Sequence, residues 1–463
     1  MRSSIPLLAL CGGLALLPPG RADQVDDYVQ AHLQQTLLPG AAVAVVHHGK
    51  VVKMAGYGLA NVEQGTRVSP HTVFQIQSVT KPFVATAIMM LVEEGKLTVD
   101  QPVSECLPET PPIWKSMTVR HLLTHTSGIK DFINDPTASL RLEVTDDEVF
   151  RATAARPLEF PPGERYAYSN SNYHLLAMIV RRFTGVTYGA FLRERVFQPL
   201  GMERTRVMSW SAIIPDRAAG YIRQPDQLVN GEFIAESILA YGGGGLLSTV
   251  DDMAKWDLGL RNGRVLPSAR LEQMWHPTKL NNGNSSAYGF GWGIGGTSPH
   301  RFVEHSGSHA TGFSSYIVRF LDDDLSVILL INARPDNPGK LARDLAAFFV
   351  PALKPPERKS IGDLEPETTQ LLRRVEEMVR AGRVEPEPFT AEMHRVLVQS
   401  LPDMSEGVRS LGSLQQLELL DRKVQDDERR EYLYRGRFDS AALLIHFVRD
   451  KAGKITALWQ ESE

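Results

Sequence analysis

Cysteine is scarce in this chain of 463 residues, where only Cys11 and Cys106 occur. An excess of basic residues is also missing, because 50 Lys and Arg stand against 54 Asp and Glu, for a net charge of −4. Nucleic-acid-binding proteins usually carry a basic patch, so we expect no nucleic-acid partner. After the N-terminus no apolar run reaches the ~20 residues of a membrane-spanning helix, so we expect no integral membrane span once a signal is removed.

The rest of the composition is that of an ordinary globular protein. Hydrophobic residues make up 43% of the chain and charged residues 22%, with 37 Gly and 29 Pro. These values exclude wholesale disorder, collagen-like repeats and a coiled coil. The length predicts two domains, or one large domain with an appendage.

The first 22 residues are typical of a secretory signal peptide. Arg2 supplies a positive start, residues 5–17 are apolar, and Gly20-Arg21-Ala22 gives a small-x-small cleavage pattern. We therefore expect an exported protein, periplasmic or secreted, that begins near Asp23. The alternative is a retained or lipidated anchor at Cys11, although Leu10 is large where a lipoprotein signal has a small residue. If Cys11 is removed, Cys106 has no partner for an intramolecular disulfide and serves as a small apolar side chain.

Residues 23–353 alternate short apolar strands with amphipathic helices, which predicts an α+β domain. The expected strands are 41–46, 51–56, 314–318 and 325–331, and the expected helices include 81–94 and 173–183. Strands at both ends around a helical middle predict that the first and last strands share one antiparallel sheet.

A linker at 354–362 and a small α+β module at 363–463 are expected after this domain. The linker contains the run Lys354-Pro355-Pro356. Two polar helices, about 365–381 and 390–400, precede three or four strands that include 432–438, 442–448 and 455–459. The module loosely resembles cystatin-like or NTF2-like modules, which implies stabilisation or partner binding rather than a second active site.

The sharpest chemical pattern is Ser78-Val79-Thr80-Lys81 at the start of a predicted helix. Residues three apart on a helix are neighbours, so the Ser78 hydroxyl and the Lys81 amine can meet. A serine becomes a nucleophile when a base takes its proton, and lysine serves if burial lowers its pKa. Ser-x-x-Lys alone is a common chance pattern.

Two further segments carry candidate residues. Tyr168-Ser169-Asn170 offers a tyrosine that can shuttle protons and an amide that can position a lysine or a substrate carbonyl, or else a simple helix N-cap. His305-Ser306-Gly307-Ser308 precedes a predicted strand, where Gly307 permits close approach of a ligand. Backbone N–H groups of Ser78 and Ser308 would then form an oxyanion hole. His305 could equally be a structural histidine.

Taken together, the chain resembles the serine β-lactamase and penicillin-binding protein superfamily, on its class C β-lactamase, D-Ala-D-Ala carboxypeptidase and esterase side. The resemblance covers about residues 23–351. It rests on the three segments above and on 74–77 (Phe-Gln-Ile-Gln), 121–128 (His-Leu-Leu-Thr-His-Thr-Ser-Gly), 199–202 (Pro-Leu-Gly-Met) and 242–246 (Gly-Gly-Gly-Gly-Leu). It implies a β-lactamase/transpeptidase-like fold, an antiparallel sheet flanked by helices plus a helical subdomain.

The resemblance also implies roles. Ser78 would be the acylated nucleophile, Lys81 its proton acceptor and Tyr168 the group that shares the proton and activates water. Asn170 would orient Lys81 and the substrate, while His305 and Gly307 would bind substrate. The departure is His305, where β-lactamases and carboxypeptidases usually carry a lysine. Histidine is mostly neutral at pH 7, which puts recognition of a substrate carboxylate in doubt.

These features predict an exported serine hydrolase that needs no cofactor and acts on an ester or amide in a small molecule or short peptide. A β-lactamase or D,D-carboxypeptidase is one alternative, and a non-catalytic cell-wall peptide-binding protein is another. His121 and His125, four residues apart, could bind zinc on a helix, but no third ligand follows in a suitable pattern, so we expect no metal. The sequence carries no signal for an oligomeric state.

Overall fold

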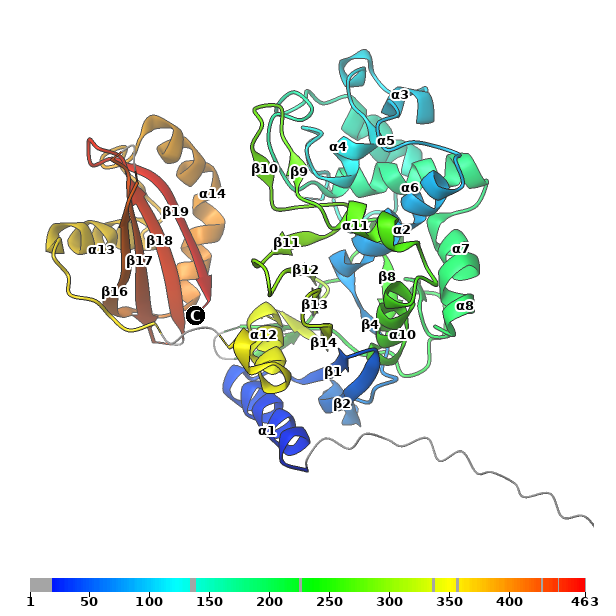
Figure 1. Ribbon diagram of the computed structural model, residues 1–463, viewed down its shortest axis with the longest axis horizontal. Coiled ribbons are helices and arrows are strands. Elements are labelled where there is room, and N and C mark those ends of the chain that lie inside the picture. The colour runs from blue at the N-terminus through cyan, green and yellow to red at the C-terminus, as the bar shows by residue number, and fades with distance from the viewer. Residues whose placement is uncertain are drawn as a thin grey trace, which may run out of the picture. The chain divides into compact units, whose positions relative to one another are not determined.

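The computed structural model describes residues 19–133, 139–224, 227–334, 338–354, 358–425, 428–439 and 441–462. The chain divides into two compact units between Lys354 and Pro355 (Figure 1). Most of the predicted signal peptide lies outside the described residues, and its cleavage stays a prediction. The predicted linker begins at the residue where the first unit ends.

A seven-stranded sheet with antiparallel neighbours forms the centre of the first unit. The predicted hairpin and the two late strands are both confirmed, and the first strand pairs with the last long one, with Val43 opposite Leu329. The strands lie in the order β11 (Gly293–Gly295), β12 (Phe302–His309), β13 (Phe313–Phe320), β14 (Leu325–Ile331), β1 (Gly40–His47), β2 (Lys50–Asn61) and β3 (Thr66–Arg67).

Both faces of this sheet are buried, as the alternation along β1 demonstrates. Ala41, Val43 and Val45 pack into one hydrophobic cluster, with α1 (Pro19–Thr36) and α12 (Pro338–Phe349). Ala42, Ala44 and Val46 pack into the other, with α2 (Thr80–Glu93) and α10 (Val250–Arg261). Successive side chains of a strand point to opposite faces, so one apolar strand serves two cores.

Helices from the middle of the chain gather at the end of this unit that lies away from α1 and β2 (Figure 1). They are α3 (Val103–Cys106), α4 (Val119–Leu123), α5 (Asp146–Ala154) and α6 (Asn170–Thr184). The other helices of the unit are α7 (Tyr188–Leu192), α8 (Gln198–Leu200), α9 (Glu236–Leu239) and α11 (Ser268–Met274). Small strands complete the unit: β4 (Phe74–Gln75), β5 (Arg206–Val207) and β8 (Leu246–Ser248) in one sheet, β6 (Tyr221–Arg223), β7 (Leu228–Asn230) and β15 (Ala333–Arg334) in another, and β9 (Thr278–Lys279) with β10 (Ser285–Ser286).

The second unit is a four-stranded antiparallel sheet with two helices and its own hydrophobic cluster. Its strands are β16 (Leu414–Val424), β17 (Arg430–Phe438), β18 (Ala442–Arg449) and β19 (Ile455–Ser462), and its helices are α13 (Pro366–Arg380) and α14 (Ala391–Ser410). The second helix continues ten residues beyond the predicted end. Leu401, Met404 and Val408 explain the extension, because they continue the helical spacing of core contacts.

Among the described residues, no single helix combines the length and hydropathy of a membrane span. The segments Asn170–Thr184 and Tyr188–Leu200 would satisfy that test only as a pair, bent by 70°. In this structure Leu175, Leu176 and Ile179 of α6 are buried in the core of the first unit.

Candidate active site

Ser78 lies in a tight turn, η1 (Gln77–Val79), immediately before α2. Gln77 adopts a left-handed conformation with φ of 48°, which costs a residue with a side chain about 1–2 kcal/mol. Its side-chain amide donates hydrogen bonds to Gln75 Oε1 at 2.8 Å and to Thr311 Oγ1 at 2.9 Å. These two bonds hold the turn that presents the serine.

Strand β8 braces the same turn from the other side. The Ile76 N–H donates to the Leu246 carbonyl at 3.0 Å, and the Leu246 N–H donates to Thr80 Oγ1 at 3.0 Å. The two hydrogen bonds therefore hold the chain in place at Ile76 and Thr80, on either side of Ser78.

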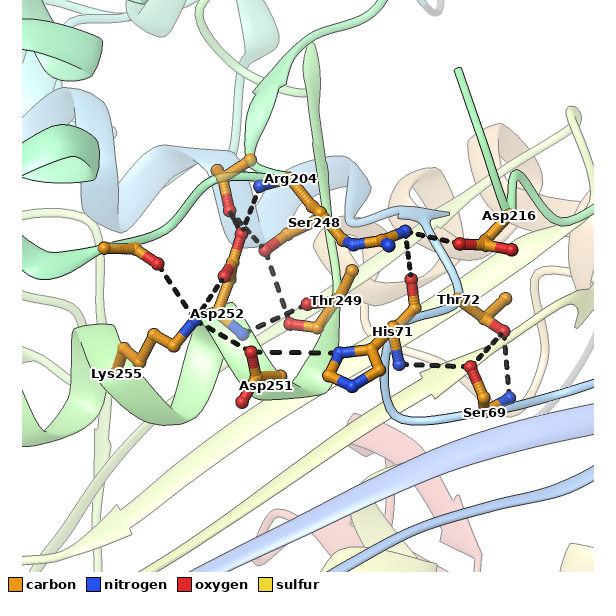
Figure 2. A network of polar contacts seen from close by, with 12 residues as sticks. Ser69, His71, Thr72, Arg204, Asp216, Ser248, Thr249, Asp251, Asp252 and Lys255 are labelled. Atoms are coloured by element: carbon orange, nitrogen blue, oxygen red, sulfur yellow. Dashed lines mark hydrogen bonds and ion pairs between the residues drawn. The ribbon is translucent and has the colours of Figure 1, made fainter.

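A polar network ties β8 to the rest of the unit (Figure 2). The Asp252 carboxylate at the start of α10 accepts hydrogen bonds from the Arg204 N–H and Thr205 Oγ1, both at 2.9 Å. Thr205 Oγ1 also contacts Ser248 Oγ at 2.8 Å, at the end of β8. Lys255 lies 2.8 Å from the Asp251 carboxylate, and this contact extends the network along the helix. Strand β8, which supports the turn at Ser78, is thus anchored to a long helix.

Lys81 is fully buried, with its side chain 0% exposed. Its Nζ donates to Ser78 Oγ at 3.0 Å, Asn170 Oδ1 at 2.9 Å and the Gly243 carbonyl at 2.7 Å. Burial lowers the pKa of Lys81 from its ordinary value of 10.5 to about 7, and the negative charge of Asp131 partly opposes this shift. Near neutral pH a large fraction of Lys81 is therefore unprotonated and able to accept the Ser78 proton.

Tyr168 lies beside this pair. Lys81 Nζ sits 4.7 Å from the centre of its ring. Tyr168 as a residue is 37% exposed. Desolvation of its hydroxyl raises the pKa of Tyr168 above the ordinary value, and a hydrogen bond with Ser78 acts in the lowering direction. The phenol is thus protonated at neutral pH. Ser169 occupies the N-cap position of α6, but its side chain makes no capping hydrogen bond, so the simple N-cap interpretation does not account for this segment.

Asn170 connects the lysine to a carboxylate. Its Oδ1 accepts from Lys81 and from the Tyr241 hydroxyl at 2.8 Å, while its Nδ2 donates to Asp131 Oδ2 at 2.9 Å. The orientation of the amide is fixed by these partners, since only the oxygen can accept and only the nitrogen can donate. The amide oxygen of Asn170 is therefore one of the groups that hold Lys81 Nζ in place, and the role that the family resemblance implies for Asn170 toward the substrate stays a prediction.

His305 lies on β12, is 6% exposed and has a partner at each ring nitrogen. Nδ1 is 2.6 Å from the Ser306 carbonyl and Nε2 is 2.9 Å from the Tyr288 hydroxyl. A carbonyl oxygen only accepts, so Nδ1 carries the proton and Nε2 accepts from Tyr288. Burial, with the positive charge of Lys81, lowers the pKa of His305 to about 3, so the ring is neutral at pH 7.

Gly307 allows β12 to lie directly against the turn that contains Ser78. A Cβ atom at this position would come 2.4 Å from Ser315 Oγ and 2.5 Å from the Ile76 carbonyl oxygen. Ser315 Oγ donates to that same carbonyl at 2.6 Å, which fixes β13 against the turn as well. Ser308 follows on the strand, and an oxyanion hole formed by the N–H groups of Ser78 and Ser308 stays a prediction.

The histidines of the 121–128 segment do not form a pair. His121 Nδ1 accepts from the Thr118 N–H at 3.0 Å, whereas His125 lies beyond α4, has φ of 55° and accepts from the Ser169 N–H at 3.2 Å. The ring of His125 instead packs 4.3 Å from that of Tyr168. In the described part of the chain, no group of three His, Cys, Asp or Glu side chains could hold a metal ion.

Four groups at the site were missed by reasoning from sequence: Asp131, the Gly243 carbonyl, Tyr241 and Tyr288. Each approaches its partner from a distant part of the chain, so local spacing carries no signal for it. The run of four glycines at 242–245 is the one feature of the sequence that indicates close packing of the backbone near these groups. A Cβ on Gly243 would collide with the Tyr241 ring at 2.3 Å, which explains why glycine stands there.

The α+β fold and the Ser-x-x-Lys pair together define a class of serine hydrolase, and comparison with known proteins identifies the same class. The chain belongs to the beta-lactamase family, whose profile matches residues 25–351. It is a serine hydrolase of that family, which includes penicillin-binding proteins as well as β-lactamases.

Two individual relatives share less than a third of the aligned residues with this chain. The chain is 31% identical over 312 residues to penicillin-binding protein 4* of Bacillus subtilis (strain 168), which covers 64% of this chain and 68% of the relative. It is 28% identical over 376 residues to a D-aminopeptidase of Gluconobacter oxydans (strain 621H), covering 80% and 69%. The chain thus spans about two thirds of the length of these curated relatives.

Solved structures confirm the α+β fold. The octameric penicillin-binding protein homologue from Pyrococcus abyssi is similar over 95% of this chain and 96% of its own, with a TM-score of 0.62 and 24% identity. The D-amino acid amidase from Ochrobactrum anthropi SV3 gives the same TM-score and identity over 71% of this chain and 99% of its own. At this identity the likeness is one of fold.

Proposed function

We propose that this protein hydrolyses small esters or amides that lack a carboxylate next to the scissile bond, through a covalent acyl-serine and without a cofactor. The observation that carries the proposal is the neutral His305, with both ring nitrogens already bound. A lysine at that position would offer a permanent cation to a substrate carboxylate, with charge-assisted bonds worth roughly 1.5–3 kcal/mol. A neutral imidazole offers none.

The chemistry follows from the positions of Ser78, Lys81 and Tyr168. Unprotonated Lys81 takes the Ser78 proton while Oγ attacks the carbonyl carbon, and the N–H groups of Ser78 and Ser308 stabilise the oxyanion. Tyr168 then donates its proton to the leaving alcohol or amine and recovers one from Lys81. In the second half, water attacks the acyl-serine and its proton passes to the Tyr168–Lys81 pair. The pair returns that proton to Ser78 Oγ as the acyl–oxygen bond breaks, which restores the starting state.

The names of two relatives support an amide substrate, since one is a D-aminopeptidase and another structure is that of a D-amino acid amidase. A second candidate function is that of a β-lactamase or D,D-carboxypeptidase, which the penicillin-binding protein 4* of Bacillus subtilis favours by its name. The two candidates differ in whether the substrate carries a carboxylate.

Comparison of wild type with Ser78→Ala and His305→Lys separates them. Fluorophosphonate should label wild type once and Ser78→Ala not at all. Wild type should hydrolyse nitrophenyl butyrate readily and benzylpenicillin weakly, and His305→Lys should raise the penicillin-to-butyrate ratio by about tenfold. Faster turnover of penicillin than of butyrate by wild type, or an unchanged ratio in His305→Lys, would refute the proposal, as would labelling at another serine.

We further propose export, with a mature chain that begins near Asp23. Among the side chains of α1 that the structure describes, which begin at Gln24, the first buried one is Val25, so the described packing of this helix lies after the proposed cleavage site. N-terminal sequencing of the secreted or periplasmic protein should start near Asp23. Recovery of Met1, or of a lipid on Cys11, would contradict this expectation.

A further inference from the structure

Tyr166, two residues before Tyr168, belongs to the aromatic group around the proton donor of the site. The rings of both tyrosines pack against that of His125, with centres 6.1 Å and 4.3 Å away. The Tyr166 ring also lies 5.6 Å from that of Tyr288, whose hydroxyl contacts His305. Tyr166 therefore shares its surroundings with Tyr168 and with His305.

The loop that carries both tyrosines is held by its backbone. The Ala167 N–H donates to the His125 carbonyl at 2.9 Å, and the Ser169 N–H donates to His125 Nδ1 at 3.2 Å. These two hydrogen bonds lie on either side of Tyr168, and the first of them immediately follows Tyr166. The position of Tyr166 relative to Tyr168 is therefore set before a substrate arrives.

The hydroxyl of Tyr166 lies toward the site, whereas its ring is open to solvent. Loss of water around the hydroxyl raises the pKa of Tyr166 to about 12, so the phenol is uncharged at neutral pH. Desolvation raises the pKa of Tyr168 and of Tyr288, and the nearby Tyr166 hydroxyl adds to both shifts. Tyr166 as a residue is nevertheless 40% exposed. Its exposed surface therefore includes the ring.

The leaving group of a substrate has to reach Tyr168, because this residue donates the proton that the leaving group takes up. The side chains that contact the Tyr168 ring are themselves buried: Lys81, His125 and His305. They leave little surface for the rest of the leaving group. The ring of Tyr166 offers an open surface nearby, and that surface is aromatic and uncharged.

We propose that Tyr166 makes this site selective for esters and amides with an aromatic leaving group, such as a benzyl alcohol or a benzylamine, because the two rings stack. The inference rests on the proposed acyl-serine mechanism and concerns the part of the substrate that departs in its first half. Aromatic rings whose centres lie roughly 4.5–7 Å apart gain about three- to tenfold in affinity beyond the area that they bury. Stacking also holds the scissile oxygen or nitrogen near the Tyr168 hydroxyl.

The first test compares benzyl, cyclohexylmethyl and methyl butyrate in wild type. All three esters give the same butyryl-serine, so differences in kcat/KM arise before the leaving group departs. Benzyl butyrate should be cleaved with kcat/KM about tenfold above that of methyl butyrate. It should also exceed cyclohexylmethyl butyrate, whose ring has the same size without π electrons, by about threefold. A benzyl ester that is no better than either of the others would overturn the proposal.

The variant Tyr166→Leu removes the aromatic ring and keeps an apolar side chain, whereas Tyr166→Phe keeps the ring. The benzyl-to-cyclohexylmethyl ratio of kcat/KM should fall to about one in Tyr166→Leu and stay near the wild-type value in Tyr166→Phe. A purely structural role for Tyr166 would lower all rates alike and leave the ratio intact, which would refute recognition. Phe233→Leu, at an exposed aromatic residue whose ring stacks on Trp210, is the matched control and should keep the wild-type ratio.

A failure of this proposal differs visibly from a failure of the mechanism itself. If fluorophosphonate does not label Ser78 and no ester is hydrolysed, the proposed function fails, and the role of Tyr166 fails with it. If Ser78 is labelled and the esters are hydrolysed without preference for the benzyl group, only the role of Tyr166 fails. If Tyr166→Leu does not fold, the comparison of the three esters in wild type still decides.

Discussion

The two units of the chain treat buried polar groups differently. The first unit buries Lys81, His125, His305, Asp257 and Arg319 behind apolar side chains. Among the described residues of the second unit, the buried polar side chains are Thr368 and Ser405, neither of which is ionisable at neutral pH. The described core of the second unit contains no buried side chain that is charged at neutral pH. The first unit retains buried ionisable side chains, and the loss of water around them opposes folding.

Burial alone does not identify chemistry, as Arg319 demonstrates. Its guanidinium pairs with the buried Asp257 carboxylate, so each charge has a partner of opposite sign. Lys81 instead donates to a hydroxyl, an amide oxygen and a carbonyl, all of them neutral. A buried amine among neutral partners has a lowered pKa and becomes a base, while a buried ion pair remains structural.

The largest effect is expected at Lys81. Lys81→Ala should lower kcat/KM for nitrophenyl butyrate by about 10²–10⁴-fold, because the general base is lost. In wild type, kcat/KM should rise with pH through about 7 as Lys81 loses its proton. Rates measured from pH 5.5 to 9 check both statements, with Lys423→Ala, at an exposed residue of the second unit, as control. Activity of Lys81→Ala within tenfold of wild type would contradict the assignment.

The same residue makes a prediction about stability. The folded pKa of about 7 lies below the unfolded value of 10.5, so the unfolded chain binds more protons between these pH values. Unfolding free energy should therefore rise with pH across this window in wild type, and the rise should shrink in Lys81→Met. Urea unfolding at pH 7, 8.5 and 10 measures it.

A glycine in each unit gives a second comparison. Gly307→Ala places a Cβ 2.5 Å from the Ile76 carbonyl, so we expect the β12 strand to shift and activity to fall by about 10²-fold, as when an oxyanion donor is displaced. Gly436→Ala in β17 meets Ile445 Cδ1 at 3.0 Å and Phe438 Cε2 at 3.1 Å, which are side-chain atoms that can move. Hydrolysis should be unaffected there. Equal activity losses in the two variants would show that the close approach at Gly307 is not what matters.

The smallest effect is expected from removal of the second unit. Each unit has its own hydrophobic cluster, so a chain that ends at Lys354 should fold. Fluorophosphonate labelling of Ser78 and butyrate hydrolysis should stay close to those of the full chain. A large loss of either would instead assign the second unit a part in the reaction.

Sequence reasoning succeeded where the relevant contacts are local. Ser78 and Lys81 are one helical turn apart, and the β1–β2 hairpin joins neighbouring segments, so spacing alone predicts both. The contacts of Lys81 with Asn170 and with the Gly243 carbonyl span 89 and 162 residues. No periodicity encodes such distances. The contact between Asn170 and Asp131, which are 39 residues apart, belongs to the same class, because nothing in its own loop distinguishes Asp131 from any other polar turn residue.

The central sheet leaves part of its margin open next to the site. Strand β11 pairs with β12 only at Phe302, Val303 and Glu304, so from His305 onward β13 is the paired neighbour of β12. Exposed strand margins invite pairing with another molecule and are a common origin of aggregation. Here the open stretch runs from His305 to His309, with exposed side chains at Ser306 and Ser308 rather than apolar ones. The polar side chains along this stretch disfavour pairing with a second copy of the sheet, while the strand itself stays available to a small ligand at the site.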